Sequence, residues 1–445
     1  MAKQKSKQAW VVAVNMGYGH QRAAHPFHDM AKGGIITAND YPGIPKNDRV
    51  IWERSRAFYE TVSRAKHIPL FGEALFEWYD RTFQAITPLY PKHSEAAADW
   101  QLKQTYKLIR EGWGKDLIDR LAKDGQRPLL TTFFIVAFFA EEHGYPGDIY
   151  CLATDTDISR QWAPLEPPKT RIRYFAPTPR AAERLALYGV PKKNIILTGV
   201  SLPPENIGGL GMPTLKADLW KRLHHLDPRH YFIGKYQDTL RRHLGPEKEP
   251  GNGRPLTITF AVGGAGAQQE IGGEIAWSLR RRLRRGECVL NLVAGTKPSI
   301  TRYFTRKMRL LRLGSRLGKN IHIITAPTKD EYFQQFNRAL RTTDILWTKP
   351  SELVFYTGLG LPIIMAPPIG SQEDFNRRWL FSIGGGTDQL DPRYTDQWLF
   401  DWLASGWLAE AAWQGFIDAP KLGTYEMKRV IFHKHRRHEQ SVTAL

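Results

Sequence analysis

Cysteine is scarce in this chain of 445 residues, and no group of cysteines and histidines has the spacing of a metal site. Cys151 and Cys288 lie far apart in the sequence, which excludes a disulfide framework and is typical of a reducing compartment. Without a Cys/His cluster, no structural zinc is expected. We therefore expect a cytoplasmic protein without a structural zinc site.

Long hydrophobic runs are also missing. The longest apolar stretch, residues 129–140, is well short of the ~20 residues that a membrane-spanning helix needs. The basic start, residues 1–5, leads into a strand-length run and not into a signal-peptide core with a cleavage site. With 42% hydrophobic and 24% charged residues the chain is expected to be globular, and any membrane contact to be peripheral, on the inner face of the cell membrane.

Acidic residues are too few to balance the basic ones. The formal net charge is +19 and the sequence pI is near 9.8, which indicates an anionic partner such as a phosphorylated substrate, an anionic bilayer or a nucleic acid. No RNP-type or helix-turn-helix signature is present, which disfavours nucleic acid. Residues 277–319 hold thirteen Lys and Arg residues against one acid, Glu287. This region is interpreted either as a solvated face or as a surface for anionic lipid.

Two series of strand-like runs alternate with helical segments. The first comprises residues 11–15, 129–131, 149–153, 173–176 and 194–199, and the second comprises residues 256–260, 289–293, 321–324, 344–347 and 362–365. Buried apolar strands that alternate with helices predict a doubly wound parallel sheet in each half. The predicted fold class is therefore α/β with two Rossmann-like domains.

Composition sets the expected domain boundaries. Residues 1–200 form the first Rossmann-like domain, and residues 256–390 form the second. Residues 201–255 are rich in proline, glycine and charge, and are interpreted as a linker with an insertion. Residues 391–445 are helical and tryptophan-rich, and we expect them to pack back on the first domain.

A glycine-rich turn follows the first strand of each series. In the first half, Gly17 and Gly19 match two glycines of a dinucleotide-binding fingerprint, but Arg22 stands where the third belongs. His20 lies at the carboxyl end of a strand, where an imidazole can act as a general base near neutral pH. A surface or helix-capping histidine is the alternative.

In the second half, a turn of small residues follows the strand at 256–260. It contains Gly263, Gly264, Ala265, Gly266 and Ala267. Small side chains let backbone amides approach an anion, and the start of the next helix adds a positive end. This turn is therefore predicted to bind a diphosphate, with a flexible turn as the alternative.

Polar side chains follow two further strands of the second half. Lys349, Ser351 and Glu352 come after residues 344–347, and Gln372, Glu373 and Asn376 come after residues 362–365. The carboxyl ends of parallel strands meet at one edge of a sheet, so both clusters are expected beside the glycine turn. Lys349 can offset phosphate charge, Glu352 can hold ribose hydroxyls, and the amide and carboxylate groups of the second cluster can hold a sugar.

Together these motifs resemble the glycosyltransferases of GT-B fold. They are similar to those of monogalactosyldiacylglycerol synthase, the processive diacylglycerol glucosyltransferases and the N-acetylglucosaminyltransferase of peptidoglycan precursor synthesis. The matching motifs are Gly17-Tyr18-Gly19-His20, Thr154-Asp155-Thr156-Asp157 with Trp162, residues 263–268, Thr348-Lys349-Pro350, and Gln372-Glu373 with Asn376. The resemblance implies two domains that face each other across a cleft, with the nucleotide sugar held mainly by the second.

The resemblance also implies site roles. His20 or Asp155 would be the catalytic base, and Gly17, Gly19, Asp157 and Trp162 would lie on the acceptor side. The family places a glutamate where this chain has Phe355, so Glu352 is the candidate substitute.

The implied activity is inverting transfer of a hexose from a UDP-sugar to an acceptor hydroxyl, with a lipid as one candidate acceptor. The resemblance also implies that no metal and no cofactor take part, since the UDP-sugar is the donor substrate. A UDP-sugar 2-epimerase and a non-catalytic sensor of a nucleotide sugar or lipid are the alternatives. The donor sugar, the acceptor and the oligomeric state stay open.

Overall fold

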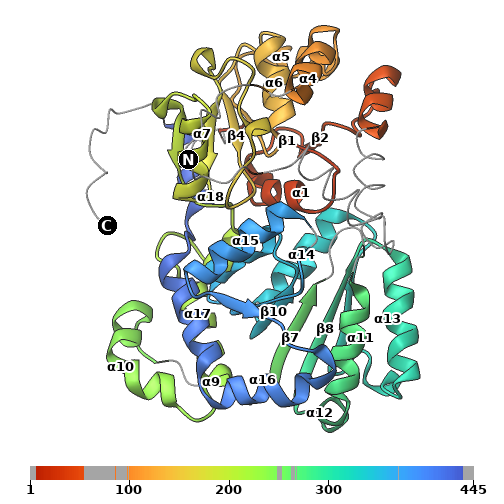
Figure 1. Cartoon of the computed structure of the whole chain (residues 1–445), viewed down its shortest axis with the longest axis vertical. Helices are drawn as coiled ribbons and strands as arrows, with labels where there is room; N and C mark the ends of the chain where they lie inside the picture. The colour runs from red at the N-terminus through yellow and green to blue at the C-terminus, as the bar shows by residue number, and fades with distance from the viewer. Residues whose placement is uncertain are drawn as a thin grey trace, which may run out of the picture. The chain divides into compact units, whose positions relative to one another are not determined.

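The computed structural model describes residues 7–54, 86, 98, 100–247, 253–261, 266, 268–368 and 370–433. By their contacts these residues form two compact units. The first comprises residues up to Met16, Pro26–Ser201 and the segment from Leu422 onward, and the second comprises Gly17–His25 and Leu202–Lys421. Each unit contains one six-stranded sheet within the described part of the chain (Figure 1).

The first sheet has the order β2-β1-β3-β4-β5-β6, with all neighbours parallel. Its strands are β1 (Trp10–Ala13), β2 (Ile36–Thr37), β3 (Leu129–Thr131), β4 (Ile149–Leu152), β5 (Arg173–Ala176) and β6 (Ile195–Leu197). The α-helices that the structure describes in this unit are α4 (Trp100–Arg110), α5 (Lys115–Ala122), α6 (Phe134–Glu142), α7 (Pro179–Leu187) and α18 (Gly423–Phe432). Strand β4 is buried along its whole length, as a strand covered on both faces requires.

Local sequence sets the ends of α7. The Thr178 hydroxyl accepts a hydrogen bond from the Ala181 amide at 3.1 Å, and Pro179 occupies the first helical position, where no amide hydrogen is needed. Gly189, at φ +93°, turns the chain out of the helix in a conformation that favours glycine.

The second sheet has the order β12-β11-β10-β7-β8-β9 and is also parallel. Its strands are β7 (Leu256–Ala261), β8 (Cys288–Gly295), β9 (Ile321–Thr325), β10 (Ile345–Thr348), β11 (Ile363–Met365) and β12 (Gly386–Asp388). The helices around it are α1 (Gly19–Ala24), α8 (Pro204–Ile207), α9 (Pro213–Leu226), α10 (Tyr231–Leu244), α11 (Gln269–Ser278), α12 (Arg280–Arg285), α13 (Pro298–Leu310), α14 (Lys329–Leu340), the 3-10 helix η7 (Glu352–Leu359), α15 (Ser371–Ser382), α16 (Thr395–Ala404) and α17 (Trp407–Asp418). When the six strands of this unit are numbered along the chain, their order in the sheet is the strand order of the Rossmann fold.

The prediction of two Rossmann-like domains is therefore confirmed. All ten predicted strands are present, with ends shifted by a few residues. Strands β2 and β12 were not predicted. Strand β2 has only two residues, and β12 reads Gly-Thr-Asp, so neither carries the apolar run that marks a buried strand.

The segment interpreted as linker and insertion packs within the second unit. Arg254 donates two hydrogen bonds to the buried Asp344 carboxylate, at 2.7 and 2.6 Å, and His225 contacts the same carboxylate at 3.1 Å. Helices α16 and α17 also belong to this unit, whereas α18 belongs to the first, where Lys428 pairs with Asp29 at 2.7 Å. Of the C-terminal helices that the structure describes, α18 thus belongs to the first unit, and α16 and α17 belong to the second.

Arg222 of α9 ties this segment to the second sheet. The residue is 2% exposed. Its guanidinium donates to the carbonyl oxygens of Thr343 and Leu359 at 2.8 Å, of Gly360 at 3.0 Å and of Leu340 at 3.3 Å. Leu340 and Leu359 end α14 and η7, so Arg222 satisfies carbonyls that helix ends leave without partners. Burial lowers the pKa of Arg222 to about 10, and the group stays charged at neutral pH.

Replacing Arg222 by methionine should destabilise the second unit by about 3 kcal/mol, because several buried carbonyls lose their donor. Thermal unfolding should show a fall in melting temperature of roughly 6–12 °C. Arg229→Met, at an exposed position of the same unit, is the control and should change stability by less than about 0.5 kcal/mol. Equal melting temperatures for the two variants would contradict this role of Arg222.

Candidate functional site

The candidate site lies at the carboxyl edge of the second sheet, where the strand order changes direction. Strands β7 and β10 are neighbours, and the chain leaves them toward opposite sides of the sheet. In open α/β sheets this switch point forms the crevice in which ligands bind. The segments that follow β7, β8, β10 and β11 meet there.

The glycine-rich turn after β7 is only partly described. Gly263, Gly264, Ala265 and Ala267 lie outside the described residues. Gly266 has φ +81°, a conformation that favours glycine, and a Cβ atom there would lie 2.8 Å from Cδ1 of Ile300. The next described residue, Gln268, donates from Nε2 to the Pro367 carbonyl at 2.8 Å, which ties the end of this turn to the segment after β11.

Lys349 and Glu373 connect the segments after β10 and β11. The Lys349 ammonium contacts the Glu373 carboxylate in the first turn of α15, and both side chains are mostly buried. The prediction gave Lys349 a phosphate and Glu373 a sugar hydroxyl as partners, and here the two residues bind each other.

The remaining predicted donor residues lie nearby. Asn376 of α15 is 1% exposed, and Gln372 is half-buried one turn earlier on the same helix. Ser351 is half-buried, and its amide donates to the Lys349 carbonyl at 2.7 Å in the turn before η7. The structure therefore brings Lys349, Ser351, Gln372, Glu373 and Asn376 to one edge of the sheet.

Glu352, the first residue of η7, forms an ion pair that the sequence did not indicate. Its Oε1 atom lies 3.2 Å from Nε of Arg22, whose side chain is 5% exposed. Arg22 also donates to the Tyr332 hydroxyl at 2.8 Å, and its guanidinium lies 4.6 Å from the centre of the Phe336 ring. Burial raises the pKa of Tyr332, although Arg22 opposes this, so the phenol stays neutral and Glu352 balances the buried guanidinium.

The position expected for the family glutamate is occupied by an apolar residue of the core. Phe355 is 1% exposed and packs on Trp379, with ring centres 5.1 Å apart. Its neighbour Glu352 is the acidic residue of η7, and its carboxylate is 18% exposed. The sequence did contain a sign of this ion pair. Arg22 stands where the third glycine of the dinucleotide-binding fingerprint belongs, but it was interpreted only as a departure from the fingerprint.

The first glycine turn belongs to this same unit. The backbone amide of Thr296, after β8, donates to the Tyr18 hydroxyl at 2.9 Å. A Cβ atom on Gly19 would lie 3.4 Å from the Glu352 carboxylate, so the start of α1 packs directly on that group. His20 follows as the second residue of α1 and is half-buried, and Gly17, at φ +91°, makes the turn before it.

The predicted acceptor-side residues after β4 lie in the first unit. Asp157 is buried and accepts from Nε of Arg184 at 2.9 Å and from Nη2 at 3.3 Å. Burial raises the pKa of Asp157, and Arg184 opposes the shift. Trp162 is 3% exposed and packs on Phe134, with ring centres 5.1 Å apart. In this structure both side chains belong to the core of the first unit.

Asp155 differs from these two neighbours. It is half-buried at the carboxyl end of the first sheet, and the Thr154 hydroxyl approaches its Oδ2 at 3.5 Å. Its carboxylate is therefore the more accessible one of this motif.

The described residues contain no group of three or more His, Cys, Asp or Glu side chains arranged to hold a metal ion. Within the same ranges, no helix combines the length and the apolar character needed to cross a membrane.

Comparison with known proteins gives structural matches only. No family model and no curated protein sequence matches the chain. MurG of Acinetobacter baumannii is similar at 12% identity and TM-score 0.48, over 95% of this chain and 99% of that one. Staphylococcus aureus MnaA, solved with UDP, is similar at 12% identity and TM-score 0.46, over 95% of both chains.

A third structure is the UDP-GlcNAc 2-epimerase from Neisseria meningitidis bound to UDP-GlcNAc. It is 12% identical with a TM-score of 0.42, over 74% of this chain and 81% of that one. Glycosyltransferases and 2-epimerases both occur among the similar structures. At this level of identity the similarity concerns the fold.

Proposed function

We propose that this chain is a glycosyltransferase that moves a hexose from a UDP-sugar to an acceptor hydroxyl with inversion at the anomeric carbon. The observation that carries the proposal is the convergence of Lys349, Glu352, Gln372, Glu373 and Asn376 at the switch point of a Rossmann sheet, next to a glycine-rich turn. Similar structures solved with UDP or UDP-GlcNAc support a uridine nucleotide as the ligand.

In this proposal each residue type has a chemical task. Backbone amides of the glycine-rich turn stabilise the leaving diphosphate as its charge develops. The Glu352 carboxylate accepts hydrogen bonds from the ribose hydroxyls, and Gln372 and Asn376 bind the sugar. Lys349 offsets diphosphate charge while Glu373 holds it in place.

The transfer itself needs a base. The acceptor oxygen attacks the anomeric carbon opposite the diphosphate, the bond from that carbon to the diphosphate oxygen breaks, and His20 or Asp155 takes the hydroxyl proton. The resemblance to GT-B enzymes supports a mechanism without a metal ion and a cytoplasmic site of action. A lipid is the acceptor that this resemblance favours.

Nucleotide binding tests the proposal first. Uridine diphosphate and a panel of UDP-sugars should stabilise the protein against heat, since a ligand at a hundred times its dissociation constant adds about 2.7 kcal/mol. Adenosine and guanosine diphosphates are the controls. If no uridine nucleotide stabilises the chain, the proposal fails.

Product analysis separates the alternatives. Release of UDP that depends on an added acceptor identifies a transferase. Acceptor-independent release with an epimerised sugar identifies a 2-epimerase, and binding without turnover identifies a sensor.

Replacing Gln372 by alanine should weaken binding of the UDP-sugar about tenfold and leave binding of UDP unchanged, because the amide is proposed to contact the sugar alone. Isothermal titration of both ligands checks this difference. Gln397→Ala, at an exposed position on α16 of the same unit, is the matched control. Equal losses for UDP and UDP-sugar would place Gln372 elsewhere in the site.

A further inference from the structure

A second charged region lies at the opposite edge of the second sheet. Helix α12 leads into the start of β8, and α13 is followed by the start of β9, so the C-terminal ends of both helices lie at the amino edge. Nη2 of Arg284 donates to the Leu311 carbonyl at 3.2 Å, which joins the two ends. Strand β8 separates this edge from the candidate site by roughly 25 Å, at about 3.3 Å per residue.

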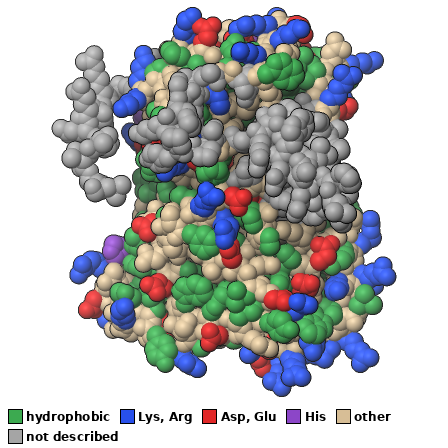
Figure 2. Space-filling model, in the orientation of Figure 1, with side chains coloured by type: hydrophobic (Ala, Val, Ile, Leu, Met, Phe, Trp, Pro, Cys, Tyr) green, Lys and Arg blue, Asp and Glu red, His purple; other side chains and the backbone are tan. Residues whose placement is uncertain are grey.

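Exposed arginines gather on these helix ends. Arg281, Arg284, Arg309 and Arg312 are exposed, and within the described ranges none of them forms an ion pair. The acid of this region, Glu287, pairs instead with Arg282 and Arg285. Lys and Arg side chains are dense along the lower right margin of the molecule in Figure 2, where Figure 1 places α12 and α13. The positive charge is thus left without a neutralising group.

Two large apolar side chains are exposed at the same edge. Leu310 is 69% exposed and Trp277, near the end of α11, is 44% exposed. Helices α11 and α13 lie side by side, since a Cβ atom on Gly273 would lie 2.8 Å from the Lys307 side chain, and both run on toward the amino edge. The Arg280 guanidinium lies 4.5 Å from the centre of the Trp277 ring.

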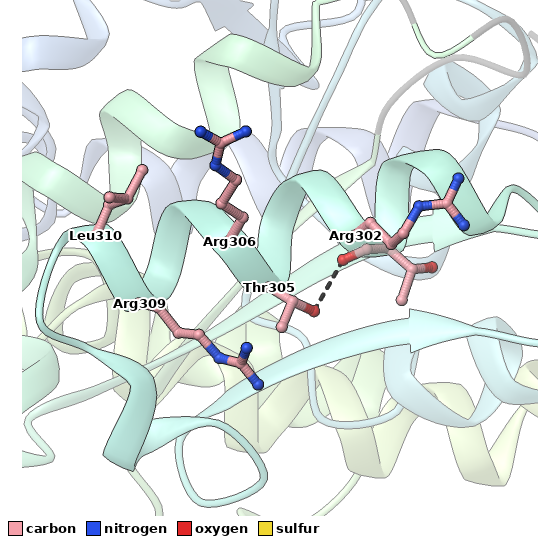
Figure 3. A pocket seen from close by; sticks show the side chains of 6 residues that line it. Arg302, Thr305, Arg306, Arg309 and Leu310 are labelled. Atoms are coloured by element: carbon pink, nitrogen blue, oxygen red, sulfur yellow. Dashed lines mark hydrogen bonds between the residues drawn. The ribbon is translucent and has the colours of Figure 1, made fainter.

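The arginines of α13 do not converge on one point. A shallow pocket on this helix is lined by Thr301, Arg302, Thr305, Arg306, Arg309 and Leu310. Figure 3 shows Arg306 and Arg309 pointing to opposite sides of the helix. The two guanidinium groups therefore do not form a site for one small anion.

We infer that Trp277, Arg281, Arg284, Arg309, Leu310 and Arg312, here called the α12–α13 surface, dock on an anionic lipid bilayer. Arginine side chains bind acidic headgroups, while tryptophan and leucine enter the boundary between headgroups and acyl chains. An apolar pair among unpaired arginines favours lipid over nucleic acid, which offers no apolar layer. The surface does not depend on the proposed transferase activity, because it lies at the far edge of the sheet from that site.

Vesicle sedimentation with the full chain tests this inference. Vesicles of phosphatidylcholine with about one third phosphatidylglycerol should bind the protein at low salt, and binding should fall steeply at roughly 0.5 M NaCl through screening. Each arginine near such a surface contributes about fivefold to partitioning. The variant R281Q/R284Q/R309Q/R312Q should therefore bind at least about 100-fold more weakly at low salt.

A second quadruple variant controls for net charge. K192Q/K193Q/R229Q/R242Q removes the same number of positive charges from exposed positions outside the α12–α13 surface and should bind within about threefold of the unchanged protein. L310S should reduce the binding that persists at high salt, which charge loss alone would not do.

Three results would overturn the inference. They are equal vesicle binding by the unchanged protein and the R281Q/R284Q/R309Q/R312Q variant, equal losses in both quadruple variants, and no vesicle binding together with tight binding of duplex DNA or RNA through the same arginines. Thermal unfolding of each variant shows whether its fold is retained.

Discussion

Replacing His20 by alanine should lower the turnover number of sugar transfer by roughly 10²–10⁴-fold, the typical contribution of a positioned general base. His20 is half-buried on α1, next to the glycine that packs on Glu352. Histidine is the side chain that most often serves as a general base. A base acts in the transition state, so kcat and kcat/KM should fall together while the affinity for UDP stays within about twofold.

Asp155→Asn is the matched variant, because it removes the other candidate base without changing side-chain size. Loss of turnover in Asp155→Asn with normal turnover in His20→Ala would assign the base to Asp155. A higher KM at unchanged kcat in His20→Ala would make this histidine an acceptor-binding group. Normal kinetics in both variants would contradict a catalytic role for either residue.

Replacing Arg22 by methionine should destabilise the second unit by about 3–5 kcal/mol, because the Glu352 carboxylate loses its buried partner. The substitution keeps an apolar side chain against Phe336 but removes the ion pair at 3.2 Å and the hydrogen bond to Tyr332 at 2.8 Å. Denaturant unfolding measures the loss. Tyr332→Phe, which removes only the hydroxyl, should cost about 1 kcal/mol.

The double variant Arg22→Met with Glu352→Gln isolates the charge pair. Without an unpaired carboxylate, the double variant should be more stable than Arg22→Met alone. If the double variant loses as much free energy of unfolding as the two single variants together, Arg22 and Glu352 do not stabilise each other.

The variant Glu352→Gln also tests whether the Glu352 carboxylate binds the ribose of the donor. A carboxylate that holds the ribose should contribute equally to UDP and UDP-sugar binding, so both affinities should fall about tenfold in this variant. Gln372→Ala, by contrast, should affect the UDP-sugar alone. Unchanged affinities in Glu352→Gln would leave this residue a structural role beside Arg22.

Several features of this protein follow from local sequence patterns. The ten strands that were predicted carry short apolar runs bounded by turns, and such runs need no partner to be recognised. The parallel arrangement then places the residues after β10 and β11 at one edge, so the grouping of Lys349 with Glu373 was predictable as a neighbourhood. Their direct contact was not predictable, because a lysine in a loop can reach several different acidic side chains.

The sequence did not show how deeply the side chains after β4 are buried. Asp157 and Trp162 fit an acceptor-side motif in sequence, and that role stays a prediction. In the structure Asp157 forms a buried ion pair with Arg184, and Trp162 packs in the core. Sequence spacing does not record which side of a loop faces inward, since packing against distant helices sets it. Asp155, one residue after Thr154, keeps its carboxylate accessible.

The sequence by itself determined the fold class, the number of domains and the sheet edge that gathers the polar residues, because strand periodicity and chain direction are local properties. Tertiary structure alone decided that the first glycine turn joins the second unit and that Arg22 holds Glu352 there. Arg22 and its partner Tyr332 are 310 positions apart in the chain. A buried guanidinium needs a counterion and a hydrogen-bond acceptor. The folded core supplies these from Glu352 and Tyr332, and no local sequence pattern encodes that choice.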